Sequence, residues 1–163
     1  MNQNFIFLPL FLQVLLTFLV GFWLMFVRLR EMQSRRIRPQ ELETRVDSSE
    51  RFNDSRPVAD NFQNLFEFPV LFYVLVIVAY LTSSVSWLLL ILLFLYVAAR
   101  VAHSVVHISY NTVLHRFWAF LISVVILLAG WVVLTTMISQ LDCRARRISF
   151  STRRRDLLAR PGQ

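Results

Sequence analysis

Four apolar blocks, each about twenty residues long, constrain the fold of this chain more than any other feature. They cover residues 5–27, 62–81, 86–108 and 116–138. A helix of about twenty apolar residues is what is needed to cross roughly 30 Å of hydrocarbon. A soluble protein of 163 residues would not be able to bury so many long apolar runs. The sequence therefore predicts an all-α fold, an integral membrane four-helix bundle.

Four spans place both chain termini on one side of the membrane, and the first connector and the turn near Tyr110 on the other. We expect one transmembrane domain over residues 1–141, followed by an arginine-rich tail over 142–163 that is surface-associated or disordered. The arginines around the end of the first span favour a cytoplasmic connector. The expected location is a membrane crossed several times, the inner (plasma) membrane if the protein is bacterial.

The net charge of +7 comes from arginine alone, because the chain contains no lysine. These arginines flank or interrupt apolar spans, whereas a nucleic-acid-binding protein carries its basic residues on a soluble face with interleaved aromatics. We therefore interpret the charge as topology control and expect no nucleic-acid partner. Cys143 is the single cysteine, so an internal disulfide is excluded.

The segment over residues 100–116 places two arginines and three histidines between two apolar runs. A charge near the middle of a bilayer costs at least a few kcal/mol, so polar residues in such a place usually have a function. Arg100, His103 and His107 follow one another at i, i+3 and i+7, which places them on one face of the third helix.

The second helix, beginning near Pro57, carries a similar polar face formed by Asp60, Asn64 and Glu67. Pro69 removes one backbone hydrogen bond and predicts a kink just after this face. The order of the four spans then brings several polar positions to the same end of the bundle: Arg28, Asn64, Glu67, His107 and Arg116.

Three interpretations of this polar end follow from the residue types. Glu67 neutralises Arg100 in a structural ion pair, while the histidines donate to backbone carbonyls. Alternatively, His103 and His107 ligate a metal or haem with Glu67, although the nearby arginines disfavour a divalent cation. The third interpretation is an anion-binding site in which arginine stabilises a thiolate nucleophile.

These residues resemble the MAPEG family, the membrane-associated proteins of eicosanoid and glutathione metabolism. The resemblance covers about Phe5 to Ile138, and its motifs occur in the family's order: VRLR at 27–30, Asn64-x-x-Glu67, RVAH at 100–103, and Arg116. The segment NFQNLFEFPVLFY is similar to sequences of the bacterial branch of the family.

The resemblance implies a homotrimer with sites between neighbouring subunits, glutathione as the cofactor, and a hydrophobic small-molecule substrate that arrives from the membrane lipid. The residues that it implies for holding glutathione are Arg28, Asn64, Glu67, His103 and His107. Arg116 is implied to lie close to the sulfur and to stabilise the thiolate, and Arg100 to pair with Glu67. We expect no metal.

We therefore expect a glutathione-dependent transferase or peroxidase that acts on lipophilic electrophiles or lipid hydroperoxides. The alternative is a non-catalytic member of the same fold that binds lipid or acts as a scaffold. Two departures from the family pattern favour this alternative. Asp60 replaces a frequent arginine and would repel a glutathione carboxylate, and His107 replaces a tyrosine.

Overall fold

The computed structural model describes residues 2–36, 52–110 and 112–158, and every regular element in them is helical. The elements are the 3₁₀ helix η1 (Gln3–Ile6), α1 (Phe7–Arg35), α3 (Arg56–Glu67), α4 (Pro69–Leu81), α5 (Trp87–Ile108) and α6 (Val113–Leu158). Four stretches are long and apolar enough to cross a membrane: Gln3–Arg35, Arg56–Leu81, Trp87–Ile108 and Val113–Cys143. The predicted all-α bundle of four spans is confirmed.

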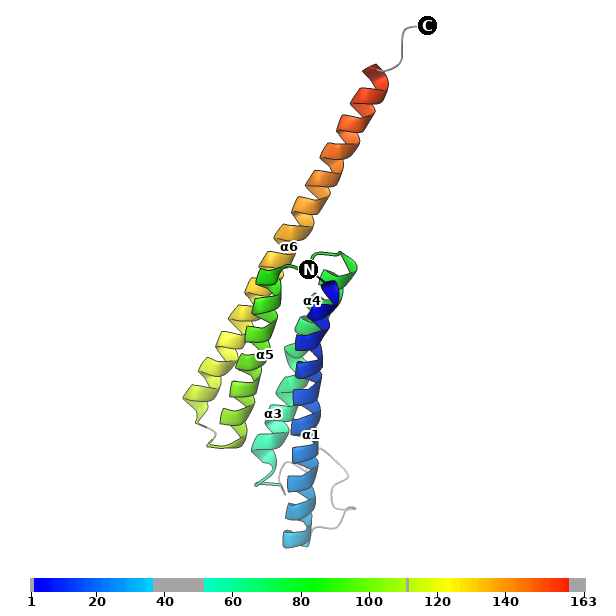
Figure 1. Cartoon of the computed structure of the whole chain (residues 1–163). Coiled ribbons are helices and arrows are strands. Elements are labelled where there is room, and N and C mark those ends of the chain that lie inside the picture. Colours follow the sequence, from blue (N-terminus) through cyan, green and yellow to red (C-terminus); the bar gives the residue numbers. More distant parts are fainter. Residues whose placement is uncertain (1, 37–51, 111, 159–163) are drawn as a thin grey trace.

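The helices run alternately up and down (Figure 1). The N-terminus and the α4–α5 turn lie at one end of the bundle, while the end of α1, the start of α3 and the α5–α6 turn lie at the other. This is the antiparallel arrangement that four consecutive spans predict. We refer below to the second end as the connector end, because Arg36 and Phe52, the described residues on either side of the first connector, lie there; residues 37–51 lie outside the described residues.

Proline shapes the second span at two places. Pro57 is in the first turn of α3, where a missing N–H costs nothing, so the second helix begins near Pro57 as predicted. Pro69 interrupts the hydrogen bonding between α3 and α4, yet Phe68 keeps helical angles of φ −68° and ψ −34°. The interruption is therefore a bend within one span rather than a turn between two.

The short turn between α4 and α5 is held by its own polar groups. The backbone N–H of Ser84 donates to the carbonyl of Ala79 at 2.9 Å, and Ser83 adopts a positive φ of 54°. The side-chain oxygen of Ser86 then accepts from the N–H of Leu89 at 3.2 Å and so caps α5. These bonds explain why four polar residues suffice to reverse the chain.

The last helix departs from the sequence-based expectation. We expected the fourth span to end near Ile138 and the tail to be surface-associated or disordered, but α6 continues as helix to Leu158 and projects from the bundle (Figure 1). It crosses the boundary expected between residues 141 and 142 without interruption. The division into a membrane domain and a tail stays a prediction.

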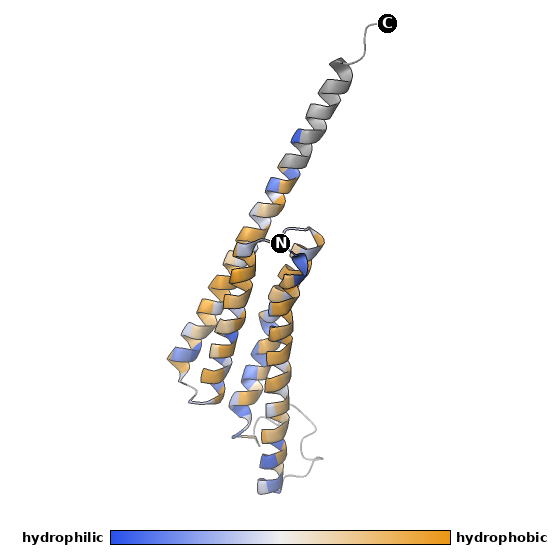
Figure 2. Cartoon of the chain, viewed as in Figure 1, coloured by the Kyte–Doolittle hydropathy of each residue, from blue (hydrophilic) through white to orange (hydrophobic). Residues whose placement is uncertain are grey.

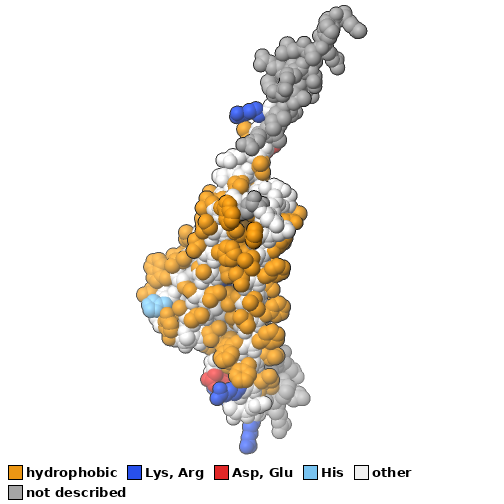
Figure 3. Space-filling view, in the orientation of Figure 1, with side chains coloured by type: hydrophobic (Ala, Val, Ile, Leu, Met, Phe, Trp, Pro, Cys, Tyr) orange, Lys and Arg blue, Asp and Glu red, His pale blue; other side chains and the backbone are white. Residues whose placement is uncertain are grey.

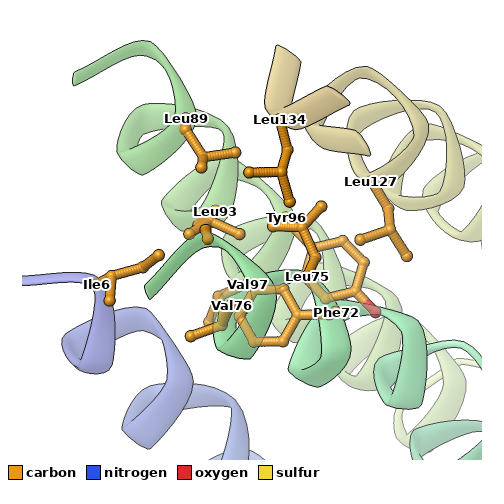
Figure 4. Packing of buried hydrophobic residues seen from close by; sticks show 11 residues of the cluster. Ile6, Phe72, Leu75, Val76, Leu89, Leu93, Tyr96, Val97, Leu127 and Leu134 are labelled. Carbon is orange, nitrogen blue, oxygen red and sulfur yellow. The ribbon is translucent and has the colours of Figure 1, made fainter. Parts of the chain in front are cut away.

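The larger of two hydrophobic core clusters lies at the end of the bundle that holds the N-terminus, and a smaller one joins the later part of α1 to α3. Ile6, Phe72, Leu93 and Tyr96 are among the buried members of the larger cluster, and the rings of Phe72 and Tyr96 stack with centroids 4.8 Å apart (Figure 4). The outer surface is apolar too: orange side chains cover the bundle in Figure 3, and Phe11 on α1 is more than half exposed. Figure 2 shows that hydrophilic residues gather mainly toward the helix ends. An apolar exterior of this kind fits a lipid environment.

Candidate functional site

One face of α5 is polar and buried inside the bundle. Arg100, His103, Ser104 and His107 are each at most 2% exposed, although they lie in a helix long and apolar enough to cross a membrane. Their spacing of three and four residues aligns them along the helix, as the sequence predicted. They face α3 and α6 toward the connector end, and we call them, with their partners below, the polar cluster.

Arg100 is the largest fully buried side chain in the described part of the protein. Its Nη2 donates to the backbone carbonyl of Asn64 at 2.8 Å, and its guanidinium carbon lies 5.8 Å from the centre of the Phe120 ring. Its Nε and Nη1 have no hydrogen-bond partner. A buried guanidinium that uses only part of its donor capacity leaves donors available for a ligand.

The predicted ion pair between Arg100 and Glu67 requires a correction. No contact within 4.0 Å joins the two side chains among the described residues, and the carboxylate of Glu67 is exposed, 3.5 Å from the amide of Gln63. The reason is helical rotation. The buried stripe of α3 includes Leu65, and two further residues turn Glu67 about 200° away from it.

His103 is oriented by the first turns of α6. Its Nδ1 lies 3.1 Å from the backbone carbonyl of Arg116, and a carbonyl only accepts, so Nδ1 carries the hydrogen. In the neutral ring Nε2 is then an acceptor, and it is buried without a partner. The ring of His107 lies 5.5 Å away, and its Nδ1 is likewise buried and unpartnered.

Asn61 and Ser104 belong to the polar cluster but were missed by the sequence analysis. The hydroxyl of Ser104 donates to Oδ1 of Asn61 at 3.3 Å, and both residues are buried. Nδ2 of Asn61 has no partner. Their positions in the sequence could have indicated that they belong to the cluster, because Ser104 follows His103 directly and Asn61 lies one turn before Asn64.

Phe120 of α6 joins the parts of this cluster. Its ring packs edge-on against Phe68 at the α3–α4 bend, with centroids 5.0 Å apart, and it also contacts His103 at 5.8 Å. Together with its contact to Arg100, this makes Phe120 an apolar wall against which the polar side chains are held. Nothing in the motif pattern distinguished this phenylalanine from fourteen others.

The remaining predicted site residues divide into two groups. Arg116 is half-buried and contributes its carbonyl to the cluster, and Asn64 is half-buried beside Arg100. Arg28 lies elsewhere: its guanidinium lies over the ring of Phe52, 5.5 Å from the centre. Within one chain, the structure brings Asn64, His103, His107 and Arg116 together but leaves Arg28 and Glu67 outside the polar cluster.

A second polar contact, also missed from the sequence, fixes the connector end. Glu31 is 3% exposed, and its Oε1 accepts from the backbone N–H groups of Asn53 and Asp54 at 2.9 and 3.1 Å. Its Oε2 accepts from the N–H of Ser55 at 3.1 Å, while Arg35 lies 3.3 Å from the carboxylate. Glu31 therefore ties the end of α1 to the start of α3.

The described residues contain no group of three or more His, Cys, Asp and Glu side chains that is arranged to hold a metal ion. A model of the MAPEG family matches residues 6–136, which is most of the chain and all four spans. The chain belongs to the MAPEG family. Comparison with curated proteins and with solved structures gave no significant match.

Membership of the MAPEG family supports a glutathione-related membrane function, of transferase or peroxidase type or related to it, in general terms. MAPEG proteins are generally oligomeric and associated with glutathione. The four apolar helices and the family together make this a multi-pass integral membrane protein.

Proposed function

We propose that this MAPEG protein is a glutathione-dependent transferase or peroxidase acting on lipophilic electrophiles or lipid hydroperoxides. The observation that carries the proposal is the set of buried polar atoms without partners at one end of the bundle: Nε and Nη1 of Arg100, Nε2 of His103, Nδ1 of His107 and Nδ2 of Asn61. Each such group costs several kcal/mol in hydrocarbon unless something pairs with it. A polar, anionic ligand would satisfy them together.

Glutathione fits this set of groups because it offers two carboxylates, an ammonium group and two amides. The proposed contacts are the unpartnered donors of Arg100, the side chain of Asn64 and the two histidines. The acceptor at Nε2 of His103 suits an N–H of the tripeptide. Arg28 and Glu67 are left out of the proposed site within one chain, because their side chains lie on other surfaces.

Arg116 is proposed to act on the sulfur. A guanidinium near a thiol favours the thiolate, which is the nucleophilic form. The thiolate attacks an electrophilic carbon, a C–S bond forms, and the leaving group departs with the electron pair of the bond that breaks. The lipophilic partner would enter from the bilayer, since the outer surface of the helices is apolar.

We further propose that the protein is a homotrimer. We also propose that its connector end lies at the cytoplasmic leaflet of the membrane. Support comes from the face of α3 that carries Asp60, Gln63 and Glu67, which is exposed in the single chain. Polar residues so close to an apolar span are usually covered by protein or water. Cross-linking in mild detergent, followed by mass measurement, checks the proposal: a product no larger than a dimer would rule out the trimer.

Calorimetric titration of the purified protein with glutathione tests the function. We expect binding to wild type and to Arg30→Ala, because Arg30 is exposed on α1 and not part of the polar cluster. Arg116→Ala should bind about tenfold more weakly, the effect of losing one charged hydrogen bond, and the pKa of the bound thiol should rise. Absence of binding by wild type at millimolar glutathione would contradict the proposal.

A non-catalytic, lipid-binding member of the same fold is the second candidate. The observation that favours it is Asp60, whose exposed carboxylate lies one turn before Asn64 and carries the same charge as the ligand's carboxylates. Asp60→Arg separates the two candidates. If Asp60 suppresses glutathione binding, this substitution should strengthen it, whereas an intact binding site would gain little.

A further inference from the structure

The proposed thiolate requires a group that accepts the thiol proton. Arg116 does not supply it, because a guanidinium stays protonated in proteins and has no acceptor. The acceptor at Nε2 of His103 is assigned above to an N–H of the tripeptide. His107 is the remaining candidate: its side chain is 1% exposed, and its Nδ1 is buried without a hydrogen-bond partner. A neutral imidazole is the side chain best suited to take a proton near neutral pH.

The contacts between α3 and α5 bring Asp60 close to His107. The two helices are antiparallel, so residues further along α5 meet residues earlier in α3 (Figure 1). The hydroxyl of Ser104 donates to the side chain of Asn61 at 3.3 Å. His107 follows Ser104 by one turn, so the residues that it faces precede Asn61 in the chain. Asp60, in this part of α3, lies within electrostatic range of His107.

Charged groups on three helices lie within this range of His107. They are Arg116 of α6, Asp60 of α3 and Arg100 of the same helix. The ring of His103 lies 5.5 Å away. Arg116 is the residue proposed to hold the sulfur, so the thiolate would form beside the imidazole of His107. Asp60 is the anion among these charges, and an anion stabilises the imidazolium that forms when His107 takes a proton.

Asp60 also provides a route to water. Its side chain is exposed and lies in the first two turns of α3, at the connector end of the bundle. No contact within 4.0 Å joins its carboxylate to His107 among the described residues, so a water molecule is needed between the two groups. Asp60 and His107 are the two positions at which the sequence departs from the family pattern, and in the fold they lie near each other.

We propose that His107 takes the thiol proton of glutathione and that Asp60 receives a proton from His107 through water, and we call this path the proton relay. The S–H bond breaks, its electron pair stays on sulfur, and the proton binds to Nδ1 of His107. The other ring nitrogen releases its hydrogen through water to the carboxylate of Asp60, which loses it to the bulk. His107 is then neutral again, and the thiolate stays beside Arg116. The proton relay rests on the proposed function.

Stopped-flow mixing of the purified full-length protein with glutathione tests the proton relay. The ultraviolet absorbance of the thiolate reports its formation, and a pH indicator reports the released proton. His107→Gln keeps a polar side chain that does not take a proton, and it should slow both signals about a hundredfold, the lower end of general acid–base catalysis. His115→Gln is the matched control: His115 is exposed at the start of α6, and its loss should leave the rate unchanged.

Asp60→Asn separates the proton relay from a simple effect of charge. Removing a negative charge near the sulfur favours the thiolate, so an electrostatic effect alone would give more thiolate and no slower formation. Loss of the relay predicts the opposite, a rate about tenfold lower, because water is a poorer proton acceptor than a carboxylate. In this variant alone, the rate should increase with buffer concentration, since a buffer base replaces the carboxylate. Asp54→Asn, which removes an exposed carboxylate at the same end of the bundle, should behave as wild type.

Calorimetry on the same proteins keeps the two proposals distinguishable. If wild type binds glutathione and either His107→Gln or Asp60→Asn forms the thiolate as fast as wild type, the proton relay is wrong while the proposed function stands. Absence of binding by wild type would contradict both. Because His107 is buried, the folding of His107→Gln is checked by thermal unfolding. Asp60 is exposed, so the rate and buffer dependence of Asp60→Asn decide the question if His107→Gln does not fold.

Discussion

Replacing Glu31 with glutamine tests whether the end of α1 holds the start of the second span. The carboxylate accepts three backbone N–H groups, from Asn53, Asp54 and Ser55, at 2.9 to 3.1 Å. The variant keeps one oxygen but loses the charge, and it turns an NH₂ group toward at least one backbone donor. The perturbation is therefore chemical, with almost no change in side-chain volume.

The expected cost follows from the number of donors left without an acceptor. A buried donor that loses its partner costs about 1–3 kcal/mol, and bonds to a charged group lie at the upper end of this range. One lost bond and two weakened ones give about 3 kcal/mol. For a chain of this size, 1 kcal/mol changes the unfolding midpoint by about 2–4 °C, so we expect a decrease of about 6–12 °C.

Thermal unfolding in detergent, followed by circular dichroism, measures this change. Arg35→Gln is the control, since it removes the two ion pairs that this 39% exposed guanidinium makes with Glu31 and Asp54 but leaves the backbone bonds of Glu31 in place. Both pairs use the same exposed Nη2, and a surface ion pair contributes about 0–1 kcal/mol, so the control should change the midpoint by about 4 °C or less. If Glu31→Gln lowers the midpoint no further than Arg35→Gln does, the backbone bonds contribute no stability and the argument fails.

Three further substitutions have outcomes that follow from the packing of the bundle. A Cβ at Gly21 would lie 2.9 Å from the ring of Phe62, whereas one at Gly130 would lie 3.3 Å from a flexible end of Leu75. Gly21→Ala should therefore lower the midpoint by several degrees and Gly130→Ala should change it little, and an equal response would contradict the close packing. Gln13 is fully buried with no partner for either amide atom, so Gln13→Leu should raise the midpoint by about 2–6 °C; a decrease would show that the amide is paired.

The helices and their order follow from local properties of the sequence. The length and apolar character of each block determine that it spans the membrane, and Pro57, Ser86 and the turn before Val113 determine where the helices begin. Even the bend at Pro69 is local, because it results from one missing N–H. The extension of α6 beyond Ile138 was missed, because hydropathy marks the end of a span but not the end of a helix.

Part of the candidate site could also be predicted from local features of the sequence. The spacing of Arg100, His103 and His107 predicted one shared face of α5, and all three are buried. The partners of these residues were predicted less well. Arg100 bonds to the backbone of Asn64 rather than to Glu67, and a backbone carbonyl has no signature in the sequence.

The sequence by itself therefore determined four membrane-spanning helices, their antiparallel order, the polar face of α5 and the MAPEG motifs, because each depends on residues close together in the chain. Tertiary structure alone decided which side chains meet. The rotation of each helix about its axis depends on packing against its neighbours, and a rotation of one or two residues moves a side chain from the core to the surface. That rotation separates Glu67 from Arg100, and packing between distant segments gives Glu31 the N–H groups of a segment more than twenty residues further along the chain.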